Sequence, residues 1–133
     1  MTQETGNQDF VDAIDNVQAA YGTDADVAHG LTALREMAVL QLLYGQIEKA
    51  ERYMTVAPWL RPKDARSQRI MAHAKARQGR ALEAAKLLLS ASEGEESVVK
   101  LRDWKEVGFA LLRVQQHKLG LRCLKKSQPS ATA

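Results

Sequence analysis

An all-α fold is predicted by three features of this 133-residue chain. Aromatic residues make up only 5% of the sequence, and the abundant Ala and Leu lose little conformational freedom in a helix. Similar sequence segments begin at Gly45 and at Gly79, 34 residues apart, and an apolar helical segment precedes each of them. The length allows one domain. We therefore expect a single domain of repeated helix-turn-helix units.

The overall composition excludes several classes of protein. Hydrophobic residues at 45% and charged residues at 26% are ordinary globular values and exclude a wholly disordered or membrane-embedded chain. The single cysteine, Cys123, excludes an internal disulfide framework and fits a reducing compartment. Because no basic-then-apolar leader and no run of 18 apolar residues occurs, we expect a cytoplasmic location without membrane insertion.

The first element along the chain is an acidic N-terminal segment, residues 1–30. Within it, residues 8–21 predict an amphipathic helix whose apolar stripe is Phe10, Ile14, Val17 and Tyr21. Residues 22–30 predict a loop before the first repeat. The whole chain has a net charge of +3, but residues 1–34 contain six acidic residues and no Lys or Arg. This segregation indicates self-association, autoinhibition or an anionic partner, or simply a solvated acidic helix.

Three units follow, with predicted bounds of 31–64, 65–100 and 101–128, and residues 129–133 predict a disordered tail. Residues 92–97 predict an acidic loop. Counted from the first residue of each unit, positions 8, 20 and 27 are always small: Ala38, Ala72, Gly108, Ala50, Ala84, Gly120, Ala57, Ala91 and Ser127. Two helices approach closely only where side chains are small. Three methionines are also expected in the core: Met37 and Met71 at position 7 of their units, and Met54 at position 24.

The 34-residue period and these small positions resemble the tetratricopeptide repeat (TPR) family over about residues 31–128. The resemblance implies three irregular TPR-like repeats in a short right-handed superhelix, preceded by the N-terminal helix. The sequence departs from the family pattern at several positions. Only the third unit has the aromatic residue at position 4, Trp104, and Gln41 and Lys75 stand where the family prefers a large apolar residue.

In the TPR family, positions 2, 5, 9, 12 and 13 face a concave groove that binds peptides or helices. Carried over to this chain, the resemblance implies these partner-binding residues: Arg35, Val39, Leu42, Leu43, Arg66, Arg69, His73, Arg77, Arg102, Lys105, Phe109, Leu112 and Arg113. Seven of them are Lys or Arg and none is acidic, which predicts apolar contacts together with recognition of carboxylates. Solvated arginines on an unused face are the alternative interpretation.

Within the family, the chain resembles the small TPR-like chaperones of bacterial type III secretion in length, preceding helix and irregular repeats. This implies a cytosolic, non-enzymatic chaperone or adaptor that holds a helix or extended segment of a secreted or assembling partner. A homodimer through residues 8–21 is a second hypothesis. A basic-groove nucleic-acid-binding or regulatory protein is the alternative, although aromatic residues are too few for a base-stacking platform.

No pattern in the sequence predicts catalysis, a metal ion or a cofactor. His29, His73 and His117 do not occur at metal-ligand spacings. Cys123 lies among basic residues that would lower the pKa of its thiol, but no orienting base is evident. We therefore expect a protein that acts by binding.

Overall fold

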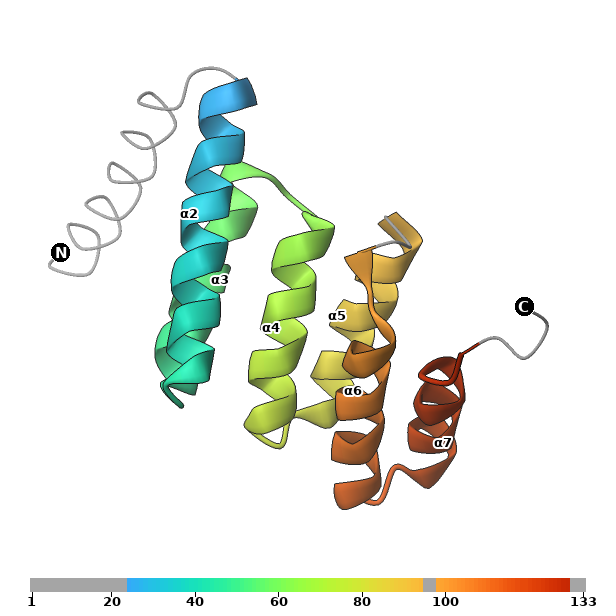
Figure 1. Ribbon diagram of the computed structural model, residues 1–133. Helices are drawn as coiled ribbons and strands as arrows, with labels where there is room; N and C mark the ends of the chain where they lie inside the picture. The colour runs from blue at the N-terminus through green and yellow to red at the C-terminus, as the bar shows by residue number, and fades with distance from the viewer. Residues whose placement is uncertain (1–23, 95–97, 130–133) are drawn as a thin grey trace, which may run out of the picture.

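The computed structural model describes residues 24–94 and 98–129, and all regular structure in them is helical. Figure 1 shows the helices in chain order. Their bounds are Asp24–Leu43 for α2, Ile47–Leu60 for α3, Ala65–Arg77 for α4, Ala81–Gly94 for α5, Leu101–Arg113 for α6 and His117–Lys126 for α7. The predicted all-α class is confirmed.

Successive helices pair into three hairpins, α2 with α3, α4 with α5, and α6 with α7. The hairpins pack side by side, because α4 contacts both α2 and α3, and α6 contacts both α4 and α5. Figure 1 shows α2, α4 and α6 in the front layer, with α3 and α5 behind them. The first helices of the hairpins therefore share one face of the molecule.

The three hairpin turns have the same backbone conformation. Gly45 and Gly79 have φ angles of 76° and 81°, and Gln115 occupies the matching place in the third turn with φ of 67°. Each turn is closed by a backbone hydrogen bond from the residue that follows: Gln46 to Gln41, Arg80 to Lys75, and Gln116 to Leu111. Glycine adopts this left-handed conformation without steric cost, whereas Gln115 adopts it at some expense.

The small residues lie where the helices cross, as predicted. All six alanines of the set are fully buried, and both glycines are buried as well. A Cβ atom added to Gly108 would lie 2.8 Å from Leu124 Cγ, and one added to Gly120 would lie 3.1 Å from Gly108 O. The approach of α6 to α7 therefore requires both glycines. Ser127, the ninth residue of the set, is half-buried.

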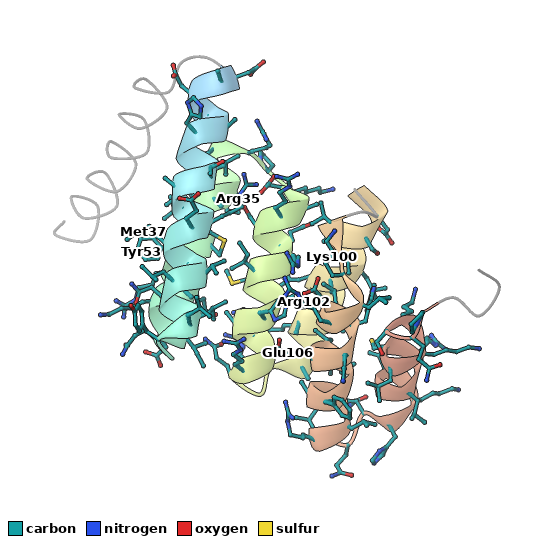
Figure 2. The ribbon with its side chains drawn as sticks, in the orientation of Figure 1. Arg35, Met37, Tyr53, Lys100, Arg102 and Glu106 are labelled. Atoms are coloured by element: carbon teal, nitrogen blue, oxygen red, sulfur yellow. The ribbon has the colours of Figure 1, made fainter. Side chains whose placement is uncertain are left out.

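The methionine prediction is only partly right. Met54 is buried and Met71 is partly buried, both in the core cluster shared by α2, α3 and α4. Met37 is 42% exposed, so it lies outside the core that the described residues form. Figure 2 shows Met37 on the side of α2 that faces away from α4, and no other described helix packs there.

Two helix boundaries differ from the sequence-based expectation. α2 begins at Asp24, so residues 24–30 are helical rather than part of the predicted loop. Asp24 and Asp26 lie in its first turn, where carboxylates are favoured by the helix dipole. α5 continues to Gly94, which removes the start of the loop predicted at residues 92–97.

The predicted unit boundaries agree better with the helices. α4 and α6 begin at Ala65 and Leu101, the first residues of the predicted second and third units. The predicted helix at residues 8–21 and the last four residues of the predicted tail lie outside the described residues.

Candidate functional site

A groove of about 380 Å³ lies on the face shared by α2, α4 and α6. Figure 2 shows Arg102 and Glu106 of α6 on this face. The groove is lined by Val39, Leu42, Leu43, Arg69, Ile70, His73, Arg77, Arg102 and Glu106. Its α2 wall is apolar, and its α4 and α6 walls are largely charged. A ligand in the groove would therefore contact both kinds of surface.

A second hollow of about 450 Å³ continues the groove toward the beginning of α4. The two share Val39, Arg69 and Ile70 as lining residues. The hollow adds Arg35 of α2, Arg66 of α4, and Val98 and Lys100 from the segment before α6. This end of the groove is consequently the more basic one.

The structure brings together nine of the thirteen residues predicted to bind a partner. Seven line the groove, and Arg35 and Arg66 line the adjoining hollow. The other four line neither: Lys105, Phe109, Leu112 and Arg113. They belong to α6, which is the last helix of its layer in the described chain, so no further helix forms an opposite wall for them.

A buried carboxylate is hydrogen-bonded to two of the side chains that line the groove. Asp103 on α6 is fully buried, and its Oδ2 accepts hydrogen bonds from Arg69 Nε at 2.6 Å and from the backbone N–H of Lys100 at 2.7 Å. Its Oδ1 lies 2.6 Å from His73 Nε2. Arg69 and His73 stand one turn apart on α4, so Asp103 joins α6 to two successive turns of the neighbouring helix.

Glu106 extends this cluster by one turn along α6. It is hydrogen-bonded to His73 Nδ1, and its Oε1 accepts a hydrogen bond from Arg77 Nε at 3.0 Å. Arg77 also donates from Nη1 to the backbone carbonyl of Leu42 at 3.2 Å. A single side chain on α4 therefore contacts both α2 and α6.

Both ring nitrogens of His73 face carboxylates, which fixes its protonation. Burial by itself would lower the pKa of His73, but hydrogen bonds to Asp103 and Glu106 outweigh it and raise that pKa to about 9. Burial opposes ionisation of Asp103 as well, yet hydrogen bonds from His73 and Arg69 lower its pKa to about 2. The hydrogen bond from His73 is the main cause that lowers the pKa of Glu106 to about 2. All three groups are charged at neutral pH.

These contacts correct the expectation of a groove without acidic residues. Asp103 and Glu106 occupy positions 3 and 6 of the third unit, which are not among the groove positions carried over from the TPR family. The sequence does contain a signal for them. Acids three residues apart on α6 match cations four residues apart on α4, at the spacing of one helix face.

The five arginines that line the groove and the adjoining hollow consequently fall into two groups. Arg35, Arg69 and Arg77 each pair with a carboxylate; the partner of Arg35 is Asp64, at 2.9 Å. Arg66 and Arg102 are exposed, and neither forms an ion pair with a residue in the described ranges. Only the second group is available to an anionic ligand without breaking contacts inside the protein.

Cys123 is buried, and burial raises the pKa of its thiol against the opposing effect of nearby Lys126 and Arg122. The expectation of a lowered thiol pKa is therefore wrong. In the part of the chain that the structure describes, no three His, Cys, Asp or Glu side chains are grouped so that they could hold a metal ion. Over the same residues, no helix has the length and apolar character needed to span a bilayer. The chain matches no protein-family model and no curated protein.

Proposed function

We propose that this chain is a non-enzymatic protein-interaction module built from three irregular TPR-like repeats in a short superhelix. Its groove between α2, α4 and α6 holds an amphipathic helix or extended segment of a partner. The supporting observation is the composition of the groove walls. Val39 and Leu43 are 41% and 78% exposed on the α2 wall, while Arg66 and Arg102 are exposed near the opposite walls.

The apolar wall supplies the binding free energy in this proposal. Val39 and Leu43 stand one turn apart, so they form one strip that an apolar side chain of the partner would cover. Burying an exposed side chain of this size contributes about 1.5–3 kcal/mol. The arginine contacts must add to this contribution, because association itself costs at least about 4 kcal/mol in lost translational and rotational freedom.

Arg66 and Arg102, the two arginines of the groove and its adjoining hollow that form no ion pair among the described residues, would orient the bound segment. A guanidinium group binds a carboxylate through two parallel hydrogen bonds, which fixes the direction of an acidic segment. Because Arg69 and Arg77 are held by Asp103 and Glu106, the groove presents its shape before the partner arrives. A partner segment with apolar anchors and flanking acids would match these surfaces.

In a cell, such a module would act as a cytosolic chaperone or adaptor. It would shield an aggregation-prone segment of a secreted or assembling protein, as the resemblance to type III secretion chaperones implies. Nucleic-acid binding has less support, because Arg35, Arg69 and Arg77 already bind carboxylates and would contribute little to phosphate contacts.

Selection from a random peptide library displayed on phage tests the proposal directly. The immobilised protein should enrich peptides that combine two or three large apolar residues with Asp or Glu. Leu43→Glu should abolish binding of the enriched peptides, because it places a charge on the apolar strip. Leu121→Glu is the matched control, since Leu121 is also well exposed but lies on α7, away from the groove.

Two results would reject the groove as the binding site. One is the absence of any enriched peptide sequence. The other is enrichment of peptides that bind the wild-type chain and Leu43→Glu equally well. Charge reversal at Arg66 and Arg102 should weaken binding without unfolding the chain, whereas reversal at Arg69 would disrupt Asp103 and report on folding.

A further inference from the structure

One side of α2 is apolar and is not covered by any described residue. Met37 and Leu40 are 42% and 43% exposed, and Tyr44 is exposed one turn further on. These three residues are spaced so that they share one side of the helix. Figure 2 shows Met37 and Tyr53 together on the side of the molecule that faces away from α4.

The equivalent positions of the other two hairpins are covered. Positions 3, 7 and 10 hold Ser67, Met71 and Ala74 in the second unit, and Asp103, Val107 and Ala110 in the third. All are buried except Met71, which is partly buried. The reason is that α3 packs against α4, and α5 packs against α6. In α2 the same positions are all exposed: Ala33, Met37 and Leu40.

The opposite end of the stack has a different surface. On α7 the exposed residues include Lys118, Arg122 and Lys125, with Leu121 among them. A stacked array stays soluble when its terminal helix presents a polar outer face. α7 meets this requirement through its own charges, whereas the exposed side of α2 from Ala33 to Tyr44 does not. The side of α2 therefore needs another element to cover it.

We propose that residues 8–21 cover this side of α2 as an antiparallel amphipathic helix. This segment lies outside the described residues, and its sequence carries the apolar stripe Phe10, Ile14, Val17 and Tyr21. Only residues 22 and 23 separate it from Asp24, where α2 begins. A connection of two residues is typical of antiparallel helix neighbours and folds the segment back along α2.

The lengths of the two helices determine which residues meet. A helix of 14 residues is about 21 Å long, and Met37 lies about 20 Å along α2 from Asp24. Phe10 therefore falls within one helical turn of Met37. Asp9, Asp12 and Asp15 lie mostly off the apolar stripe, and they supply the polar outer face that the exposed side of α2 lacks.

This cap leaves the groove open. Val39 and Leu43 line the groove, and Leu40 borders a neighbouring hollow together with them, so residues 8–21 would lie beside the groove without filling it. The acidic segment is then a cap for the first hairpin and not a ligand for the basic groove of its own chain or of a second copy. The inference does not depend on the proposed function.

Paired cysteines in the full-length chain test this arrangement, with Cys123→Ala as the background. Phe10→Cys with Met37→Cys should form a disulfide within one molecule under mild oxidation, without a change in molecular mass. Phe10→Cys with Val39→Cys is the control pair, because Val39 is as exposed as Met37 and stands only two residues from it but lines the groove. A disulfide between two copies, faster formation by the control pair, or no disulfide at all would each overturn the proposal.

A second measurement does not require a disulfide to form. With Met37→Cys as the only cysteine, the thiol should react about tenfold faster with a maleimide when Phe10 and Ile14 are both changed to Asp. A single cysteine from Val39→Cys should react at the same rate in both backgrounds, because Val39 lines the groove. Equal rates at position 37 in the two backgrounds would overturn the proposal even if every variant is fully folded.

Discussion

Between the first and second hairpins, α4 packs against α2 and α3 mainly through apolar side chains such as Leu42, Met54 and Ile70. Between the second and third hairpins, α6 contacts α4 through apolar residues such as Val107 and also through the buried Asp103. The two junctions have similar backbone geometry but different chemistry. Ion pairs occur at both junctions, because Glu51 pairs with Lys75 and Asp64 pairs with Arg35 at the first, but among the described residues only the second junction contains a fully buried carboxylate.

This difference has consequences for stability. An apolar contact loses free energy in proportion to the area and volume removed, and it is insensitive to pH. A buried ion pair costs more when one partner is removed, because the other charge remains desolvated. The second junction should therefore be the more fragile one, and it should respond more strongly to pH than the first, where a hydrogen bond with Lys75 also lowers the pKa of Glu51.

The largest effect is expected from Asp103→Ala. This change leaves the Arg69 guanidinium and the protonated His73 without their shared carboxylate, and it also removes the acceptor for the backbone N–H of Lys100. We expect the free energy of unfolding in urea to fall by about 4 kcal/mol.

Asp64→Ala is the matched control for this variant. Asp64 also accepts hydrogen bonds from an arginine and from a backbone N–H at the beginning of a helix, but it lies at the first junction and is not fully buried. Its loss should cost about 1–2 kcal/mol. Equal losses for the two variants would contradict a special role for the buried cluster.

Met54→Ala should have the next largest effect. Met54 is 2% exposed in the apolar cluster of the first junction, and its truncation leaves a cavity. The expected loss is about 3 kcal/mol. Urea titrations at several pH values should show the same loss throughout; a loss that varies with pH would mean that the two junctions are coupled.

The wild-type chain should lose stability as the pH rises from about 6.5 to about 9. The folded protein holds the pKa of His73 above its ordinary value of 6.5, so the contribution of its charge is complete below pH 6.5 and disappears as the pH passes 9. The slope is at most about 1.4 kcal/mol per pH unit. His73→Gln should flatten this alkaline slope, and Met54→Ala should retain it.

At acid pH the stability changes in the opposite direction, because it falls as the pH is lowered. The pKa values of Asp103 and Glu106 are lowered to about 2, so their contribution is present above their ordinary values and is lost as the pH falls toward 2. Thermal unfolding across this range should give the highest stability between about pH 5 and 6.5. A profile that is flat from pH 6 to 9 would contradict the charge state derived for His73.

The smallest effect is expected at the turns within the hairpins. Gln115 adopts the left-handed conformation that glycine provides in the first two turns. Gln115→Gly should therefore stabilise the chain by about 0.5–1 kcal/mol, and Gly79→Ala should destabilise it by a similar amount. Thermal denaturation of both variants checks this, and a loss of stability in Gln115→Gly would show that the hydrogen bond between Gln115 Oε1 and His117 Nε2, at 2.9 Å, outweighs the backbone strain.

Local chemistry was sufficient to predict the all-α class, the hairpin turns and the small buried residues, but not the helical structure of residues 24–30. The small residues, the two turn glycines and the unit boundaries at residues 65 and 101 follow from short-range steric rules, so they can be read without knowing what lies nearby. The predicted groove residues on α2 and α4 also come together in space. These features depend on where a residue stands within its own hairpin. A 34-residue period puts equivalent residues at the same place in each hairpin.

The pairing of charges and the exposure of helix faces required the folded structure. Arg69 and Asp103 are 34 residues apart, and the matching charge spacings on α4 and α6 identify them as partners only once the two helices are known to be neighbours. Met37 matches Met71 in sequence, but only Met71 has a described helix packed beside it. Burial and ion pairing depend on which neighbour occupies the adjoining space, and that is decided when the hairpins stack.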